Sequence, residues 1–309
     1  MKKHSIALLL LLVLLTGCGA KTEEAPWQTA YRETGKYLQE QDTLSAGSVG
    51  GEWAVIGLSR AGLLSDETAQ SYEQTVEDYV KQAGSVRLHQ AKSTENSRTI
   101  LGLTAAGYNA ANMAGVDLTA GLTDMAYLRA QGTNGPIWAL IALDCHGYDI
   151  PQCADGEEQT TREGLVAEIL SYQCSDGGWA LMGDESDVDM TAMALTSLAP
   201  YQEETDIKAA VDAALTYLSD AQQADGGFMS WGAANSESCA QVIVALTALG
   251  IDPAADSRFV KNGASPLDGL CAFACEGGMR YGYRAGLLRT GRLRPLPAGP
   301  DTPVRHDGY

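Results

Sequence analysis

The stretch QCSDGGW, residues 173–179, is followed 49 residues later by a second copy, QQADGGF, residues 222–228. Two glycines in each copy permit the φ > 0 backbone conformations that end a helix and turn the chain. A shorter third copy, residues 275–279, places its acid, Glu276, 51 residues after Asp225. The copies indicate a structural repeat of about 50 residues. The residues that correspond in the first two copies are Gln173 and Gln222, Asp176 and Asp225, Gly177 and Gly226, Gly178 and Gly227, and Trp179 and Phe228.

Apolar segments rich in small residues recur along the chain with a similar period. Each segment ends at Gly or Pro, and successive ends are 45, 40, 53 and 50 residues apart. That spacing is typical of repeats built from helix pairs. The segments are residues 53–62, 99–107, 137–147, 190–200 and 239–250.

Amphipathic stretches lie between these apolar segments, with large residues three or four positions apart. A helix that is apolar on all sides must be buried, whereas an amphipathic helix covers it and faces water. We therefore expect an all-α protein in which inner apolar helices form a ring inside a ring of outer helices. The four amphipathic stripes are Trp27, Tyr31, Thr34 and Leu38; Tyr72, Val76 and Tyr79; Leu165, Ile169 and Tyr172; and Ile207, Val211, Ala214 and Leu218.

The motif and the helix-pair pattern resemble the prenyltransferase and squalene-cyclase repeat family, whose Q-x-x-D-G-G-W element stands twice in good form here. The resemblance covers residues 27–283. It implies an α/α-toroid of five helix pairs and an incomplete sixth. Within the element, the Asp is suited to cap free amides and the aromatic ring to wedge between outer helices, so the element specifies a scaffold rather than a reaction.

The N-terminus has the composition of a secretory signal peptide, residues 1–17, with Lys2 and Lys3 before an apolar run at residues 6–15. That run is too short to span a bilayer as a mature helix. It leads into Leu15-Thr16-Gly17-Cys18, which resembles the lipobox of bacterial lipoproteins. The resemblance implies export, a lipid on Cys18 that anchors the protein to the membrane outside the cytoplasm, and a polar tether at residues 18–26. The alternative is a membrane anchor in which Cys18 is incidental.

The excess of acidic over basic residues indicates which kinds of partner the protein can bind. The chain has 21 basic and 39 acidic residues, a formal net charge of −18, so its surface repels phosphate backbones and nucleic acid is not an expected partner. Six cysteines follow Cys18, and an exported protein could oxidise them. Cys145 and Cys153 are the first pair to test; the alternative is small buried thiols. The six are Cys145, Cys153, Cys174, Cys239, Cys271 and Cys275.

Residues 187–192, DVDMTA, resemble the D-x-D-D-T-A motif of proton-initiated terpene cyclases such as squalene-hopene cyclase. By position Asp189 would be the proton donor and Asp187 its neighbour, but Met190 stands where the motif has a third Asp. The alternative, which we favour, is that both carboxylates precede an apolar helix and cap its free amides.

Neither a metal nor a cofactor is expected. Protein prenyltransferases of the family hold zinc with an Asp and a Cys from one inner helix and a His from another. The adjacent residues Asp144, Cys145 and His146 have the right types, but consecutive residues on a helix point in different directions.

We therefore expect a non-catalytic binding or interaction module, for an apolar or large ring-shaped small molecule or a surface ligand that the sequence does not identify. The family's fold serves in this way in corrinoid-binding proteins, an analogy of fold alone. Trp53 and Trp138 are the candidate ligand-binding residues, with ordinary core packing as the alternative. The other functions are a terpene-cyclase-like enzyme that uses Asp189 and a structural surface scaffold.

The C-terminal residues depart from the repeat. Residues 280–309 hold six of the thirteen Arg, four of the ten Pro and no Lys. The third motif copy predicts a sixth inner helix, yet residues 284–309 show no helical pattern. We interpret this as a shifted reading frame near residue 283, which would leave the ring without its last inner helix and expose apolar faces at the gap. The alternative is a genuine basic tail.

Overall fold

The computed structural model describes residues 24–41, 44–230, 232–275 and 278–279. The predicted signal peptide, the lipid attachment at Cys18, the start of the tether and the tail at 284–309 lie outside the described residues. Within the described ranges, no helix combines the length and the apolar character needed to cross a membrane.

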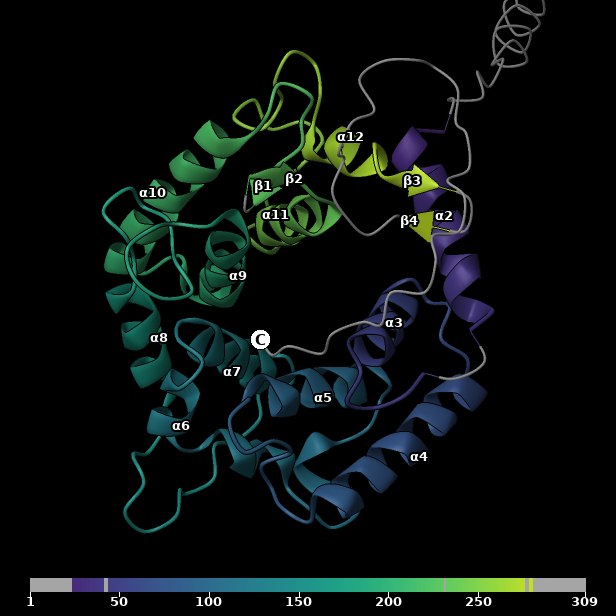
Figure 1. The fold of residues 1–309 in the computed structure, drawn as a ribbon, viewed down its shortest axis with the longest axis vertical. Coiled ribbons are helices and arrows are strands. Elements are labelled where there is room, and N and C mark those ends of the chain that lie inside the picture. Colours follow the sequence, from purple (N-terminus) through teal and green to yellow (C-terminus); the bar gives the residue numbers. More distant parts are fainter. Residues whose placement is uncertain (1–23, 42–43, 231, 276–277, 280–309) are drawn as a thin grey trace, which may run out of the picture.

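Five apolar helices stand side by side in an inner row, and they coincide with the five apolar segments of the sequence. Each packs against the next in chain order, as Figure 1 shows around the centre of the view. The predicted inner helices are thus confirmed. They are α3 (Val49–Arg60), α5 (Thr94–Ala105), α7 (Asn134–Asp144), α9 (Val188–Leu198) and α11 (Ser236–Ala248).

An outer layer surrounds this row. In α4, α8 and α10 most of the predicted apolar stripe is buried, because the inner helices cover it. In α2, by contrast, Gly35 is the buried residue, and the predicted stripe is left partly exposed. The outer helices are α2 (Pro26–Gln39), α4 (Asp66–Ala83), α8 (Arg162–Ser171), α10 (Thr205–Ala221) and α12 (Pro266–Cys271).

The outer layer beside α5 and α7 holds short elements in place of a long helix: the 3₁₀ helices η1 (Ala110–Asn112) and η2 (Leu118–Leu122), which pack on α5, and α6 (Met125–Arg129), which packs on α7. A third 3₁₀ helix, η3 (Ala199–Tyr201), ends α9. The strands of the described residues form two short antiparallel pairs: β1 (Met229–Ser230) with β2 (Ala233–Ala234), and β3 (Ala274–Cys275) with β4 (Gly278–Met279). The described chain is therefore mostly helical, as expected.

The first motif copy forms the turn between α8 and α9, and side-chain hydrogen bonds hold this turn in place. Gln173 Nε2 donates to the carbonyl of Gly177 at 2.9 Å and to that of Ala210, in α10, at 2.9 Å. Asp176 accepts from the Gly178 amide at 3.1 Å, as predicted for a capping carboxylate. The glutamine thus fastens the turn to the next outer helix.

The second copy repeats these bonds. Gln222 Nε2 donates to the carbonyls of Gly226 at 3.1 Å and Phe259 at 2.9 Å, and Asp225 accepts from the Gly227 amide at 3.1 Å. In each copy the distant carbonyl lies 37 residues beyond the glutamine. The 49-residue offset predicted from the sequence is therefore the structural repeat.

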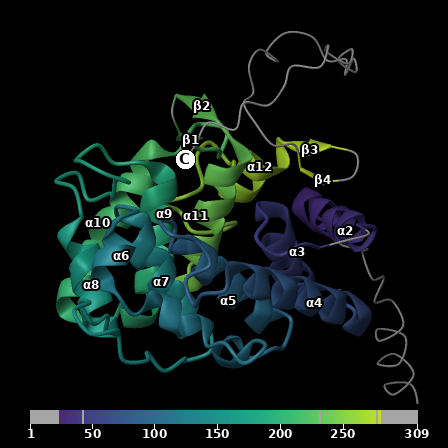
Figure 2. The same cartoon turned by 60° about the horizontal axis from the view of Figure 1, so that its bottom comes forward.

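The aromatic residues of the motif belong to the core. Trp179 and Phe228 are both fully buried. The indole nitrogen of Trp179 donates to the carbonyl of Ile169 at 2.7 Å, which ties the turn to α8. The third copy lies at β3 and β4, and β4 packs on α2 (Figure 2).

The six cysteines after Cys18 are free thiols. Cys145 and Cys153, the pair to test first, are not joined: Cys145 donates to the carbonyl of Ala142 at 3.2 Å, and Cys153 to that of Glu157 at 3.6 Å. The alternative, buried thiols, applies to Cys239, whereas the other five are at least partly exposed.

In the part of the chain that the structure describes, the inner row is open between its first and last members. The helices α3 and α11 are not among the pairs in extensive contact, although each packs on its other neighbour. The outer layer does continue across the opening, because α12 packs on α2 and α2 packs on α3. Figure 1 shows α2 and α12 outside the space that separates α3 from α11.

Candidate functional site

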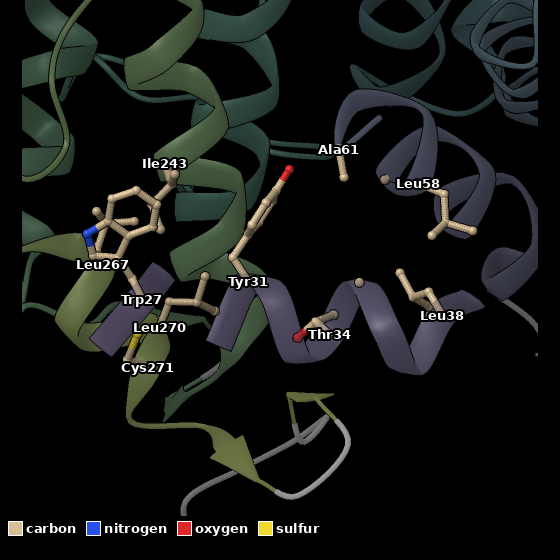
Figure 3. Close-up of a pocket in the computed structure, with 12 residues that line it drawn as sticks. Trp27, Tyr31, Thr34, Leu38, Leu58, Ala61, Ile243, Leu267, Leu270 and Cys271 are labelled. Carbon is tan, nitrogen blue, oxygen red and sulfur yellow. The ribbon is translucent and has the colours of Figure 1, made fainter. Parts of the chain in front are cut away.

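A groove of about 400 Å³ lies at the open end of the inner row. Four helices line it, two from each end of the chain, and nearly all of its lining is apolar (Figure 3). It lies where the sequence predicts an incomplete sixth pair with exposed apolar faces. The lining residues are Trp27, Tyr31, Thr34, Gly35 and Leu38 of α2; Gly57, Leu58 and Ala61 at α3 and its C-terminal end; Ile243 of α11; and Leu267, Leu270 and Cys271 of α12.

The wall formed by α2 carries two aromatic rings. Trp27, Tyr31 and Leu38 fall on one face of the helix, at positions i, i+4 and i+11. Trp27 is 40% exposed and Tyr31 is 56% exposed, which is unusual for aromatic rings that line an apolar surface. Figure 3 shows Tyr31 extending from α2 into the space between α11 and α3. This stripe was expected to face a covered core, and it faces the groove instead.

The wall formed by α3 is smooth because its residues are small. Gly57 and Ala61 stand one turn apart, with Leu58 beside them. A Cβ atom built on Gly57 would meet Leu38 Cδ1 at 3.9 Å, an ordinary van der Waals distance. A ligand can therefore approach the backbone of α3 closely along this face.

Polar groups are scarce in the groove. Among the described residues that line it, none has a charged side chain. Thr34 Oγ1 is buried and has no hydrogen-bond partner among the described residues, so it can bond to a ligand. Burial raises the pKa of the Cys271 thiol, and nearby Asp268 raises it further, so this thiol is held in its neutral form. The groove thus suits an uncharged, apolar molecule.

A second cavity, of about 410 Å³, lies at the C-terminal ends of α3, α5 and α7. Its lining mixes apolar and polar groups, and some of the polar groups are already engaged. Ser59 donates to the carbonyl of Ala105 at 2.6 Å, and the Thr104 hydroxyl is 2.8 Å from that of Tyr148. The lining residues are Ile56, Ser59, Arg60, Leu101, Thr104, Ala105 and Cys145.

The two predicted ligand-binding tryptophans contact each other. The ring centroids of Trp53, in α3, and Trp138, in α7, are 5.2 Å apart with an interplanar angle of 57°. These helices are not neighbours in the row, so the pair bridges across α5. Trp53 is 39% exposed, and neither ring lines the two cavities described above. Their role in binding stays a prediction.

Asp187 caps α9, as expected. One carboxylate oxygen accepts from the amides of Asp189 at 2.9 Å and Met190 at 3.1 Å. The other oxygen accepts from the Ser230 hydroxyl at 2.6 Å, which links the cap to β1. Both oxygens of the Asp187 carboxylate therefore accept hydrogen bonds from the protein itself, which gives this residue a structural role.

Asp189 differs from its neighbour, and the prediction that its carboxylate also caps the helix is wrong. It lies in the first turn of α9, and its Oδ1 atom is buried without a hydrogen-bond partner. Burial raises its pKa, and the charges of Asp187 and Glu237 raise it further against the opposing hydroxyls of Ser238 and Ser230. A raised pKa suits a proton donor, but neither cavity described above is lined by Asp189.

The residues weighed as zinc ligands are engaged elsewhere. Asp144 accepts from Arg162 at 2.7 Å and from the Tyr201 hydroxyl at 2.8 Å, while the ring of His146 lies against that of Tyr148. In the part of the chain that the structure describes, no three His, Cys, Asp or Glu side chains gather as a metal site would require.

Comparison of the chain with protein-family models, with curated proteins and with solved structures found no match. The groove was foreseeable from the third motif copy, which no inner-helix pattern follows. The tryptophan pair and the separate roles of Asp187 and Asp189 depend on contacts that residue spacing does not reveal.

Proposed function

We propose that the chain is an α/α-toroid of the prenyltransferase and squalene-cyclase repeat type, with five helix pairs and a sixth outer helix. Two observations support the fold: the motif hydrogen bonds repeat at one offset, and the inner helices pack in chain order. We propose that the protein acts as a non-catalytic binding module and that the groove is its binding site.

The apolar groove carries this proposal. Its volume, about 400 Å³, falls within the range of small-molecule sites, roughly 300–1,000 Å³. Along α2 it runs from Trp27 to Leu38, which at the helical rise is roughly 16 Å. An elongated ligand, such as an acyl or isoprenoid chain, fits this shape better than a large ring. Burial of its apolar surface would supply about 25 cal/mol per Å².

The proposed location agrees with such a ligand. A lipid on Cys18 and a tether at residues 18–26 would hold the domain close to the outer surface of the membrane. Acyl and isoprenoid chains are abundant there. One lipid chain alone gives marginal membrane binding, so additional contacts would strengthen the attachment.

A fluorescent apolar probe tests the proposal. We expect N-phenyl-1-naphthylamine to bind the protein with an increase in emission, and farnesol to displace it. Ala61→Phe places a ring in the groove and should weaken probe binding at least tenfold. Ala209→Phe, on the exposed face of α10, is the matched control and should bind as the parent does. Equal binding by both variants would show that the groove is not the site.

A second candidate function is proton-initiated cyclisation by Asp189, which the raised pKa of this buried carboxyl favours. Incubation with squalene should then yield a cyclised product that Asp189→Asn abolishes. Without such a product, the binding function remains the proposal.

A further inference from the structure

The groove has the position of a missing member of the inner row. Among the described elements, α5, α7 and α9 each pack between two inner neighbours, whereas α3 and α11 each have one. The outer helices α12 and α2 already cover the back of the opening. A further inner helix between α11 and α3 would extend the helix interface that the rest of the row establishes.

The walls of the groove have the character of a helix-packing surface. The apolar stripes of α8 and α10 are buried under inner helices, while the equivalent stripe of α2 leaves Trp27 and Tyr31 largely exposed. On the opposite wall, Gly57 and Ala61 permit the interaxial distances of roughly 8–10 Å at which helices pack. A helix in the groove would cover both aromatic rings and contact both small residues.

The sequence of residues 280–309 lacks the apolar pattern that the five inner helices share. Inner helices begin 12 and 11 residues after the motif acid in the first two copies, Asp176 and Asp225. The corresponding stretch after Glu276 begins near residue 287 and contains Pro295 and Pro297. Proline inside a helix removes a hydrogen bond and clashes with the preceding turn.

We propose that the groove binds an apolar α-helix of another polypeptide, which takes the sixth place in the inner row. This rests on the proposed function, because it names the partner of the same groove. The partner helix is 11 to 13 residues long, as the inner helices are, and uncharged along its middle, since none of the described residues that line the groove is charged. Its side toward α3 carries small residues.

The inner helices themselves provide the probe. A fluorescein-labelled peptide with the sequence of residues 236–249, SESCAQVIVALTAL, is mixed with the full chain, and binding is followed by fluorescence anisotropy. We expect saturable binding that Ala61→Phe weakens at least tenfold and Ala209→Phe leaves unchanged. The same peptide with Leu246→Pro should bind at least tenfold more weakly, because the proline prevents the helix from forming.

The outcomes separate this inference from the proposed function. If the naphthylamine probe binds in the groove but the peptide does not, the helix partner is ruled out and the small-molecule function stands. If neither binds, both proposals fail. If a chain that ends at Met279 binds the peptide and the full chain does not, the occupant is the protein's own residues 280–309. A dimer in light scattering that Ala61→Phe dissociates would identify a second copy as the occupant. Either of the last two results overturns the inference.

Discussion

The glutamine of the repeat motif allows a sharp test of the fold, because an adjacent glutamine provides the control. Gln222→Ala removes the donor to the carbonyls of Gly226 and Phe259, at 3.1 and 2.9 Å. A buried carbonyl that loses its donor costs roughly 1–3 kcal/mol. Gln222 Oε1 has no hydrogen-bond partner, so its removal returns part of that cost. We expect a net destabilisation of about 2 kcal/mol.

Gln223→Ala is the matched control. Its side chain is exposed, and Nε2 donates to the carbonyl of Ala221 at 2.9 Å, so its loss should change stability by less than about 0.5 kcal/mol. Urea unfolding followed by far-ultraviolet circular dichroism gives the two midpoints. Midpoints are compared because a repeat protein need not unfold in a two-state manner. Equal midpoints for the two variants would refute the role assigned to Gln222.

Three further predictions concern single residues. Burial raises the pKa of Asp189 above its ordinary value of 3.8, so its ionised carboxylate destabilises the folded state above the raised pKa, and this penalty vanishes below 3.8. Asp189→Asn should thus melt at a higher temperature than the parent at pH 7 but not at pH 3; an equal gain at both pH values would contradict this. Asp187→Ala should lose about 1–2 kcal/mol with the N-cap, whereas Asp187→Asn, which keeps an accepting oxygen, should lose clearly less in urea unfolding. Gly226→Ala should lower the melting temperature more than Gly183→Ala. The φ angles of Gly226 and Gly183 are nearly equal, 82° and 83°, so the backbone strain of an alanine is similar at both. Of the two, only Gly226 has a backbone oxygen, that of Ser265, in the way of an added Cβ atom. Equal losses would show that φ strain alone sets the cost.

The inner helices are predictable from sequence because their signals are local. An apolar run that ends at glycine specifies both a buried helix and its end, as at Gly62 and Gly250, whose φ values are 67° and 74°. The outer layer beside α5 and α7 is less predictable. There Asp117 and Asp124 cap the short elements η2 and α6, and such caps on brief turns give no hydrophobic period.

The candidate site is only partly predictable, because exposure depends on what covers a surface. The stripe of α2 has the same spacing as those of α8 and α10, but among the described residues no inner helix covers it, and Trp27 is exposed. The division of roles between Asp187 and Asp189 has a similar cause. Both precede the apolar run. Ser230, 43 residues farther along the chain, donates its hydroxyl to the carboxylate of Asp187, whereas the carboxyl of Asp189 is buried and has the charge of Glu237, in α11, near it.

A groove can be a binding site or merely a packing defect. The effects of Ala61→Phe on stability and on ligand binding distinguish these cases. Ala61→Phe covers apolar surface that is open to water in the free protein, so it should keep or raise the urea midpoint while it weakens binding of the probe and the peptide. If the side chains around Ala61 were instead tightly packed in solution, the added ring would overpack them and cost about 1–3 kcal/mol. A stable variant that no longer binds is therefore the combination that a binding groove predicts.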